Sequence, residues 1–109
     1  MTTLLALYRR PDGGDEALAT FLRRYHAEHV PLVAATPGLR SNRIQRVEQA
    51  LGGDTEFVLI AAMEFDDRAA LDAGLASDAM RQAGRNLREI APGLFTLLVL
   101  EEDAGPPDA

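Results

Sequence analysis

The segment 57–65 is apolar on both faces of the strand that it predicts. Successive residues of a strand point to opposite faces, so the segment divides into two sets. One face carries Phe57, Leu59, Ala61, Met63 and Phe65, and the other carries Val58, Ile60, Ala62 and Glu64. The last apolar segment, 94–101, is also apolar on both sides. A sheet with one face in water should alternate apolar and polar residues, so both faces of this sheet are predicted to be covered.

Four strands and two helical regions are predicted along the chain. The strands are 2–8, 39–51, 56–65 and 94–101, and the helical regions are 16–35 and 66–91. The order β-α-β-β-α-β predicts an α+β domain of the ferredoxin-like type, with a four-stranded antiparallel sheet and both helices on one face. The chain has no further element to cover the other face. A second copy of the same sheet would cover it, which predicts a symmetric homodimer.

Polar residues mark the predicted helix starts. Asp15 is expected to cap the first helix. Asp66 and Asp67 offer caps for the second helical region, and Ser77 is expected to restart it as a separate helix. Pro31 removes one backbone hydrogen bond from the first helix and is expected to bend it.

Residues 1–101 are predicted to form one domain, and 102–109 an acidic, disordered tail that ends in Gly-Pro-Pro-Asp-Ala. The net charge of −6 partly reflects this end, because 101–109 holds four of the 17 acidic residues and no basic one. The rest of the chain is close to neutral and has no basic run, so no nucleic-acid partner is expected. No apolar run is long enough to span a membrane, and the first residues lack a signal-peptide pattern, so a cytoplasmic protein is expected.

The composition excludes several kinds of chemistry. The chain has no Cys and no Lys, which excludes disulfides, thiolate metal sites, Schiff-base lysines and the lysine of a phosphate-binding loop. Its only serines, Ser41 and Ser77, do not lie in a Gly-x-Ser-x-Gly context. Any catalysis must therefore depend mainly on histidine, tyrosine or carboxylate side chains, or on a cofactor that the protein binds.

Both histidines lie in the stretch FLRRYHAEHVPL, 21–32, on the first predicted helix. At about 100° per residue, His29 falls near the middle of an apolar stripe that includes Leu22 and Tyr25. His26 falls on the edge of the stripe, next to solvent.

Two interpretations of His29 remain open. It is either a core histidine that is hydrogen-bonded to a carbonyl or a neighbouring strand, or the polar group of a pocket between helix and sheet. In the pocket interpretation His29 acts as a general acid or base and Tyr25 is its hydrogen-bonding partner. Leu22 and His26 then contact the ligand, and Glu64 supplies a carboxylate at the pocket mouth unless it is a solvated strand end.

The first helix carries a motif that resembles the opening signature of the EthD family, named for a protein associated with ethyl tert-butyl ether degradation. The motif is Phe21-x-x-x-Tyr25-x-x-x-His29-x-Pro31-Leu32, followed by Pro37-Gly38-Leu39. The later stretch EFDDRAALDAGLASDAM is similar to the family's second block. The resemblance covers about residues 2–100.

The resemblance implies a dimeric α+β barrel, in which two ferredoxin-like sheets face each other. It also implies that a small apolar or aromatic molecule binds between sheet and helices. Relatives in this superfamily include lactone isomerases, polyketide cyclases and cofactor-free monooxygenases. Only His29 and Tyr25 match the polar members of the motif, and Asn86 stands near the position where many relatives carry an aspartate.

The sequence gives less support to a metal site or an anion site than to a pocket for an apolar molecule. His26 and His29 would project about 60° apart and Glu28 to the opposite flank, so neither a metal nor a haem is expected. Three arginines on the second predicted strand could bind an anion, but such charges more often protect a sheet edge from pairing. These are Arg40, Arg43 and Arg46.

The sequence leaves three hypotheses for function. The first is a homodimeric, cofactor-free enzyme that uses acid–base chemistry on an apolar carbonyl- or lactone-bearing compound, in the manner of an isomerase, cyclase, lyase or cofactor-independent oxygenase. The second is a non-enzymatic ligand-binding accessory protein of a catabolic system. The third is a purely structural protein without a cavity.

Overall fold

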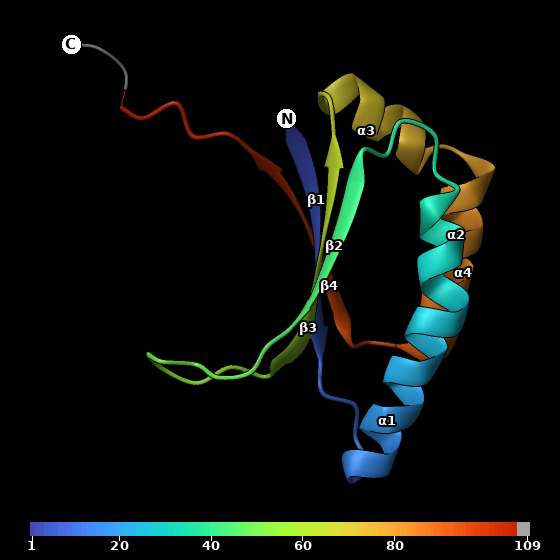
Figure 1. Cartoon of the computed structure of the whole chain (residues 1–109), viewed down its shortest axis with the longest axis vertical. Coiled ribbons are helices and arrows are strands. Elements are labelled where there is room, and N and C mark those ends of the chain that lie inside the picture. The colour runs from blue at the N-terminus through green and yellow to red at the C-terminus, as the bar shows by residue number, and fades with distance from the viewer. Residues whose placement is uncertain (107–109) are drawn as a thin grey trace.

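The computed structural model describes residues 1–106 and consists of one sheet covered by helices on one side (Figure 1). The elements are β1 (Thr2–Arg9), α1 (Gly14–Arg24), the π-helical turn η1 (Tyr25–His29), α2 (Val30–Ala34), β2 (Ser41–Arg46), β3 (Phe57–Phe65), α3 (Arg68–Leu75), α4 (Asp78–Ile90) and β4 (Phe95–Glu101). The strands are antiparallel in the order β2-β3-β1-β4. This confirms the predicted ferredoxin-like α+β fold.

The sheet has one face against the helices and one face that no helix of residues 1–106 covers, as Figure 1 shows. In β1, Leu4, Ala6 and Tyr8 are buried under the helices. Leu5 points to the open face, between Ala62 of β3 and Leu98 of β4. The predicted apolar character of both faces is therefore present, and the open face stays exposed in the single chain.

Strand β2 is shorter than predicted, since it spans Ser41–Arg46 instead of 39–51. After one more backbone bond, from Val47 N–H to the carbonyl of Val58, the two strands separate into a loop. Gly53 has a positive φ of 70°, which favours a turn over an extended strand. In Figure 1 this loop projects away from the helices, on the side of the open face.

The helix starts agree with the prediction at two of three places. Asp67 accepts a hydrogen bond from Ala70 N–H at 2.8 Å and caps α3. Ser77 accepts one from Met80 N–H at 3.2 Å and caps α4. The predicted cap at Asp15 is wrong, because the left-handed Gly13, with φ 109°, turns the chain so that α1 begins at Gly14, two residues before the predicted start, and has no side-chain cap.

The first helical region contains a π turn where a bend at Pro31 was predicted. Val30 N–H donates to the carbonyl of Tyr25, five residues earlier. Pro31 follows directly, has no N–H, and its ring would clash with the carbonyl of Ala27 in a regular helix. A widened turn of this kind relieves such a clash and is frequent at functional sites.

The described tail residues 102–106 are exposed and form neither helix nor strand. The rest of the tail for which disorder was predicted, 107–109, lies outside the described residues. No helix within 1–106 has the length and apolar character that a membrane crossing requires.

Candidate functional site

A cavity of about 180 Å³ lies between the sheet and the helices. Strands β1, β3 and β4 line it from one side, and η1, α2, α3 and α4 from the other. The lining residues include Tyr8, His29, Met63, Met80, Gly84 and Leu97. All the lining side chains are apolar apart from those of Tyr8 and His29.

The size of the cavity limits its ligand. Pockets for drug-sized molecules measure about 300–1,000 Å³. An apolar cavity of about 150 Å³ suffices for benzene. The cavity therefore suits a compound with a single ring or an equivalent short chain.

His29 is the buried polar side chain of this cavity, with 5% of its surface exposed. Its Nδ1 lies 3.2 Å from Oδ1 of Asn86, on α4. Burial lowers the pKa of His29 below its ordinary value, and this effect exceeds the opposite effects of the hydrogen bonds to Asn86 and to the carbonyl of Ala83. The imidazole is therefore neutral at neutral pH.

Asn86 links His29 to a hydrogen-bonded group of charged side chains. Its Nδ2 donates to Oε1 of Glu28 at 3.0 Å. The Arg24 guanidinium donates twice to Glu28, at 2.7 and 3.1 Å, and once to Glu89, at 2.9 Å. The hydrogen bonds from Arg24 hold the pKa of Glu28 below its usual range, so Glu28 is ionised at neutral pH.

Tyr25 packs against His29, with ring centroids 5.2 Å apart, but it does not line the cavity. The tyrosine that lines the cavity is Tyr8, whose ring centroid is 5.1 Å from that of Tyr25. Burial raises the pKa of Tyr8, with a smaller contribution from the adjacent Tyr25, and burial also raises the pKa of Tyr25. Both phenols therefore keep their protons at neutral pH, and the hydroxyl of Tyr8 donates a hydrogen bond to that of Tyr25.

Sequence reasoning missed Tyr8 and the contact between Asn86 and His29. A signal for Tyr8 exists in the alternation of Leu4, Ala6 and Tyr8 along β1, which places this tyrosine on the same face as two small or apolar core residues. The resemblance to the EthD family singled out Asn86, but its contact with His29 could not be read from the sequence because it depends on how η1 packs against α4.

The other predicted ligand-binding residues lie apart from the cavity lining. His26 is exposed, with its ring edge-on to Tyr25 at 5.7 Å between centroids. Leu22 is half-buried and packs against the core. Glu64 lies on the open face of β3 and accepts a hydrogen bond from Ser41 Oγ at 2.9 Å, so the sheet separates it from His29. Their contact with a ligand stays a prediction.

The structure also describes the residues considered for metal and anion sites. Among residues 1–106, no group of three or more His, Asp and Glu side chains is placed to hold a metal ion. Arg40 pairs with Asp66 at 2.8 Å, while Arg43 and Arg46 are exposed on the edge strand β2.

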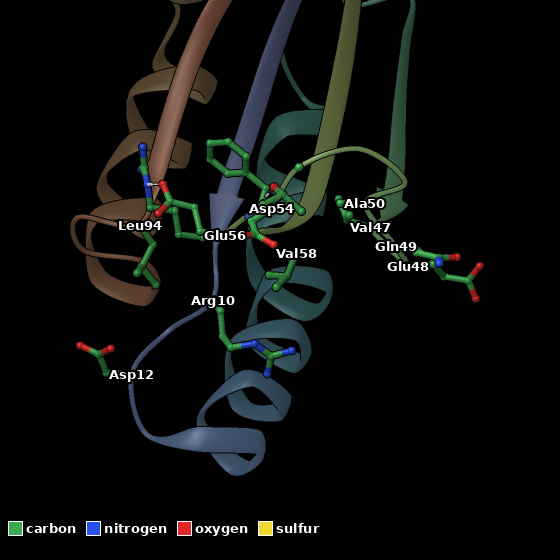
Figure 2. Close-up of a pocket in the computed structure, with 14 residues that line it drawn as sticks. Arg10, Asp12, Val47, Glu48, Gln49, Ala50, Asp54, Glu56, Val58 and Leu94 are labelled. Carbon is green, nitrogen blue, oxygen red and sulfur yellow. Dashed lines mark hydrogen bonds and ion pairs between the residues drawn. The ribbon is translucent and has the colours of Figure 1, made fainter.

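A larger hollow of about 750 Å³ lies at the end of the sheet near the β2–β3 loop (Figure 2). Arg9 on its wall is paired with Glu56 at 2.7 Å and lies over the ring of Phe57, 5.2 Å from its centroid. Figure 2 shows the side chains of Glu48 and Gln49 extending outward from the loop. None of the titratable side chains within 1–106 that line the hollow is buried, so the smaller cavity with His29 is the better candidate for chemistry.

The fold and the cavity define a ferredoxin-like α+β protein with a small, apolar, histidine-containing site. The EthD domain matches residues 15–89, and the chain belongs to the EthD family. Among curated proteins, none matches this sequence.

Solved structures share this fold, and one of them is an EthD-family protein. An EthD-family protein from Bacillus halodurans C-125 is 30% identical, with a TM-score of 0.83 over 94% of this chain and 99% of its own. A dimeric ferredoxin-like protein of unknown function from Bacteroides fragilis NCTC 9343 is 15% identical, with a TM-score of 0.68 over 93% of this chain and 95% of its own. SnoaB, a cofactor-independent oxygenase from Streptomyces nogalater, is 16% identical, with a TM-score of 0.62 over 98% of this chain and 97% of its own.

Proposed function

We propose that this protein is a small-molecule enzyme in which His29 performs acid–base chemistry, without a bound cofactor, on an apolar compound with a carbonyl or lactone group. The observation that carries the proposal is the buried imidazole of His29 in a cavity of about 180 Å³ whose other lining side chains, apart from Tyr8, are apolar. A neutral imidazole can remove a proton from an acidic C–H or O–H group and return it to the product. The surrounding apolar side chains exclude water from such a step.

The tyrosines have supporting roles in this proposal. Tyr25 packs against the ring of His29 and limits its movement. Tyr8 lines the cavity and keeps its proton, so its hydroxyl can donate to a ligand oxygen that replaces Tyr25 as its partner. The fold that this chain shares with a cofactor-independent oxygenase is compatible with such chemistry.

We also propose that the protein forms a homodimer through the open face of its sheet. The apolar side chains of that face support a second sheet as its cover. Leu98 and Leu100 on β4 are both 41% exposed in the single chain. Several proteins that share the fold are described as dimeric.

The experiment compares His29→Leu with His26→Leu, since both histidines lie on η1 but only His29 lines the cavity. Small monocyclic phenols, ketones and lactones are tested first for binding and then for turnover. Loss of both binding and turnover in His29→Leu alone supports the proposal. Normal turnover in His29→Leu refutes it.

A non-enzymatic ligand-binding function is the second candidate, and a specific observation favours it. Among residues 1–106, the polar side chains that line the cavity are those of His29 and Tyr8, and none of the other lining side chains there is a base or a nucleophile. Binding without turnover across the compounds that bind would select this candidate.

A further inference from the structure

The orientation of the Asn86 side chain follows from its contact with Glu28. The Glu28 carboxylate accepts two hydrogen bonds from Arg24 and is ionised, so it can only accept. The atom of Asn86 that faces it at 3.0 Å must therefore be the amide nitrogen. This leaves the amide oxygen, Oδ1, to face His29.

The orientation of Asn86 in turn determines which nitrogen of His29 carries the hydrogen. An amide oxygen only accepts, so Nδ1, at 3.2 Å from it, must be the donor. A neutral imidazole has one N–H, so in this assignment Oδ1 of Asn86 and the carbonyl of Ala83 share Nδ1–H, and Nε2 carries a lone pair. The two nitrogens point to different sides of the ring, and Asn86 lies outside the cavity lining while the His29 ring is part of it.

We infer that Asn86, held by Glu28 and Arg24, is a positioning residue that fixes His29 as the Nδ1–H tautomer, so that Nε2 accepts a hydrogen bond from a ligand in the cavity. This inference rests on the proposed function and narrows its ligand class. A ligand that places a hydroxyl, enol or phenol hydrogen at Nε2 gains a hydrogen bond. A carbonyl oxygen at the same place would meet the lone pair and be repelled.

The first test measures the tautomer and needs no ligand. Long-range ¹H–¹⁵N correlation spectra of the full-length protein at neutral pH distinguish a protonated ring nitrogen from one with a lone pair. The expected result is a protonated Nδ1 and an unprotonated Nε2 for His29. An Nε2–H tautomer in the unmodified protein overturns the inference.

Two variants and a matched control test whether Glu28 and Asn86 position His29. In Glu28→Gln, the new amide can also donate, so Asn86 is free to turn and a population of the Nε2–H tautomer is expected. In Asn86→Asp, a carboxylate at Nδ1 should raise the pKa of His29 and move its titration to higher pH. Glu89→Gln is the control, since Glu89 contacts Arg24 but not Asn86. A His29 spectrum and titration unchanged in both variants overturn the positioning role.

The second test compares phenol with toluene, which have nearly the same size and differ in one donor. Phenol is expected to bind about tenfold more tightly, and this preference should vanish in His29→Leu. Equal binding of both compounds overturns the inferred donor requirement but leaves the proposed function standing. Failure of both to bind overturns the inferred ligand class, while the comparison of His29→Leu with His26→Leu still decides the proposed function and the tautomer measurement still decides the role of Asn86.

Discussion

His29 and Asn86 lie 57 positions apart in the chain, yet Nδ1 of the imidazole is 3.2 Å from Oδ1 of the amide. The contact joins the π turn of the first helical region to the middle of α4. The protonation of His29 and the packing of these two helices are therefore coupled, and pH should act on both.

The free energy of unfolding should fall as the pH drops below about 6.5, which is the ordinary pKa of a histidine. Burial lowers the pKa of folded His29, so the unfolded chain takes up a proton at a higher pH than the folded protein does. His29 contributes fully to the free energy of unfolding when the pH is above the pKa that it has in the unfolded chain. This contribution is lost as the pH falls through the lower pKa that it has in the folded protein. Thermal unfolding measured between about pH 7.5 and 5 should show this decrease of stability with falling pH.

The His29→Leu variant should lose this dependence of stability on pH. His26→Leu is its control, because the ring of His26 is exposed. If His29→Leu and the unmodified protein show the same pH dependence, His29 is not the group responsible.

Replacement of Leu98 by aspartate should dissociate the homodimer that we propose. Leu98 lies on the open face, and a charge there would be buried against the second sheet without a partner. Val99→Asp is a matched control, because Val99 has nearly the same exposure, 40% against 41%, but points to the helix side of β4. Sedimentation velocity at micromolar concentration checks the result, and a monomeric unmodified protein would refute dimer formation.

Two helical glycines should respond to alanine in opposite directions. At Gly84, a Cβ would meet only Nη1 of Arg88 at 3.6 Å, so Gly84→Ala should raise the free energy of unfolding by about 0.5–1 kcal/mol through helix propensity. At Gly74, a Cβ would lie 2.9 Å from Cε2 of Phe65, so Gly74→Ala should lower it by about 1–3 kcal/mol. Denaturant unfolding measures both changes, and stabilisation by Gly74→Ala would contradict the close packing of α3 on β3.

A larger side chain at Gly84 should fill the cavity. Gly84 is part of its wall, so Gly84→Leu is expected to reduce phenol binding at least about tenfold while the far-ultraviolet circular dichroism spectrum stays unchanged. Gln82→Leu, at an exposed position of the same helix, controls for the added apolar surface. Undiminished phenol binding by Gly84→Leu would show that the ligand binds elsewhere.

The sequence contains enough information to predict the sheet and the place of His29. Phe57 to Phe65 shows the two-sided pattern of β3, and the spacing of Tyr25 and His29 places both on the buried side of the helix. These features depend on local periodicity, which the order of residues expresses directly.

Three features depend on tertiary packing or on special backbone geometry and could not be predicted in this way. The π turn before Pro31 changes the helical step that a uniform wheel assumes. The left-handed Gly13 starts α1 before Asp15 can cap it. Glu28, expected on the opposite flank from His29, is connected to it through Asn86, which comes from another helix.

The sheet that separates the cavity from the open face also bears on ligand stoichiometry. Leu97 lines the cavity while its neighbour Leu98 points to the open face, so the cavity of the single chain lies on the opposite side of the sheet from the open face. In a dimer formed through the open faces, two sheets would lie between the two cavities, at the spacing of about 10 Å that packed sheets keep. Occupation of one cavity then leaves the wall of the other unchanged, and titration should give two ligands per dimer with a Hill coefficient of about one.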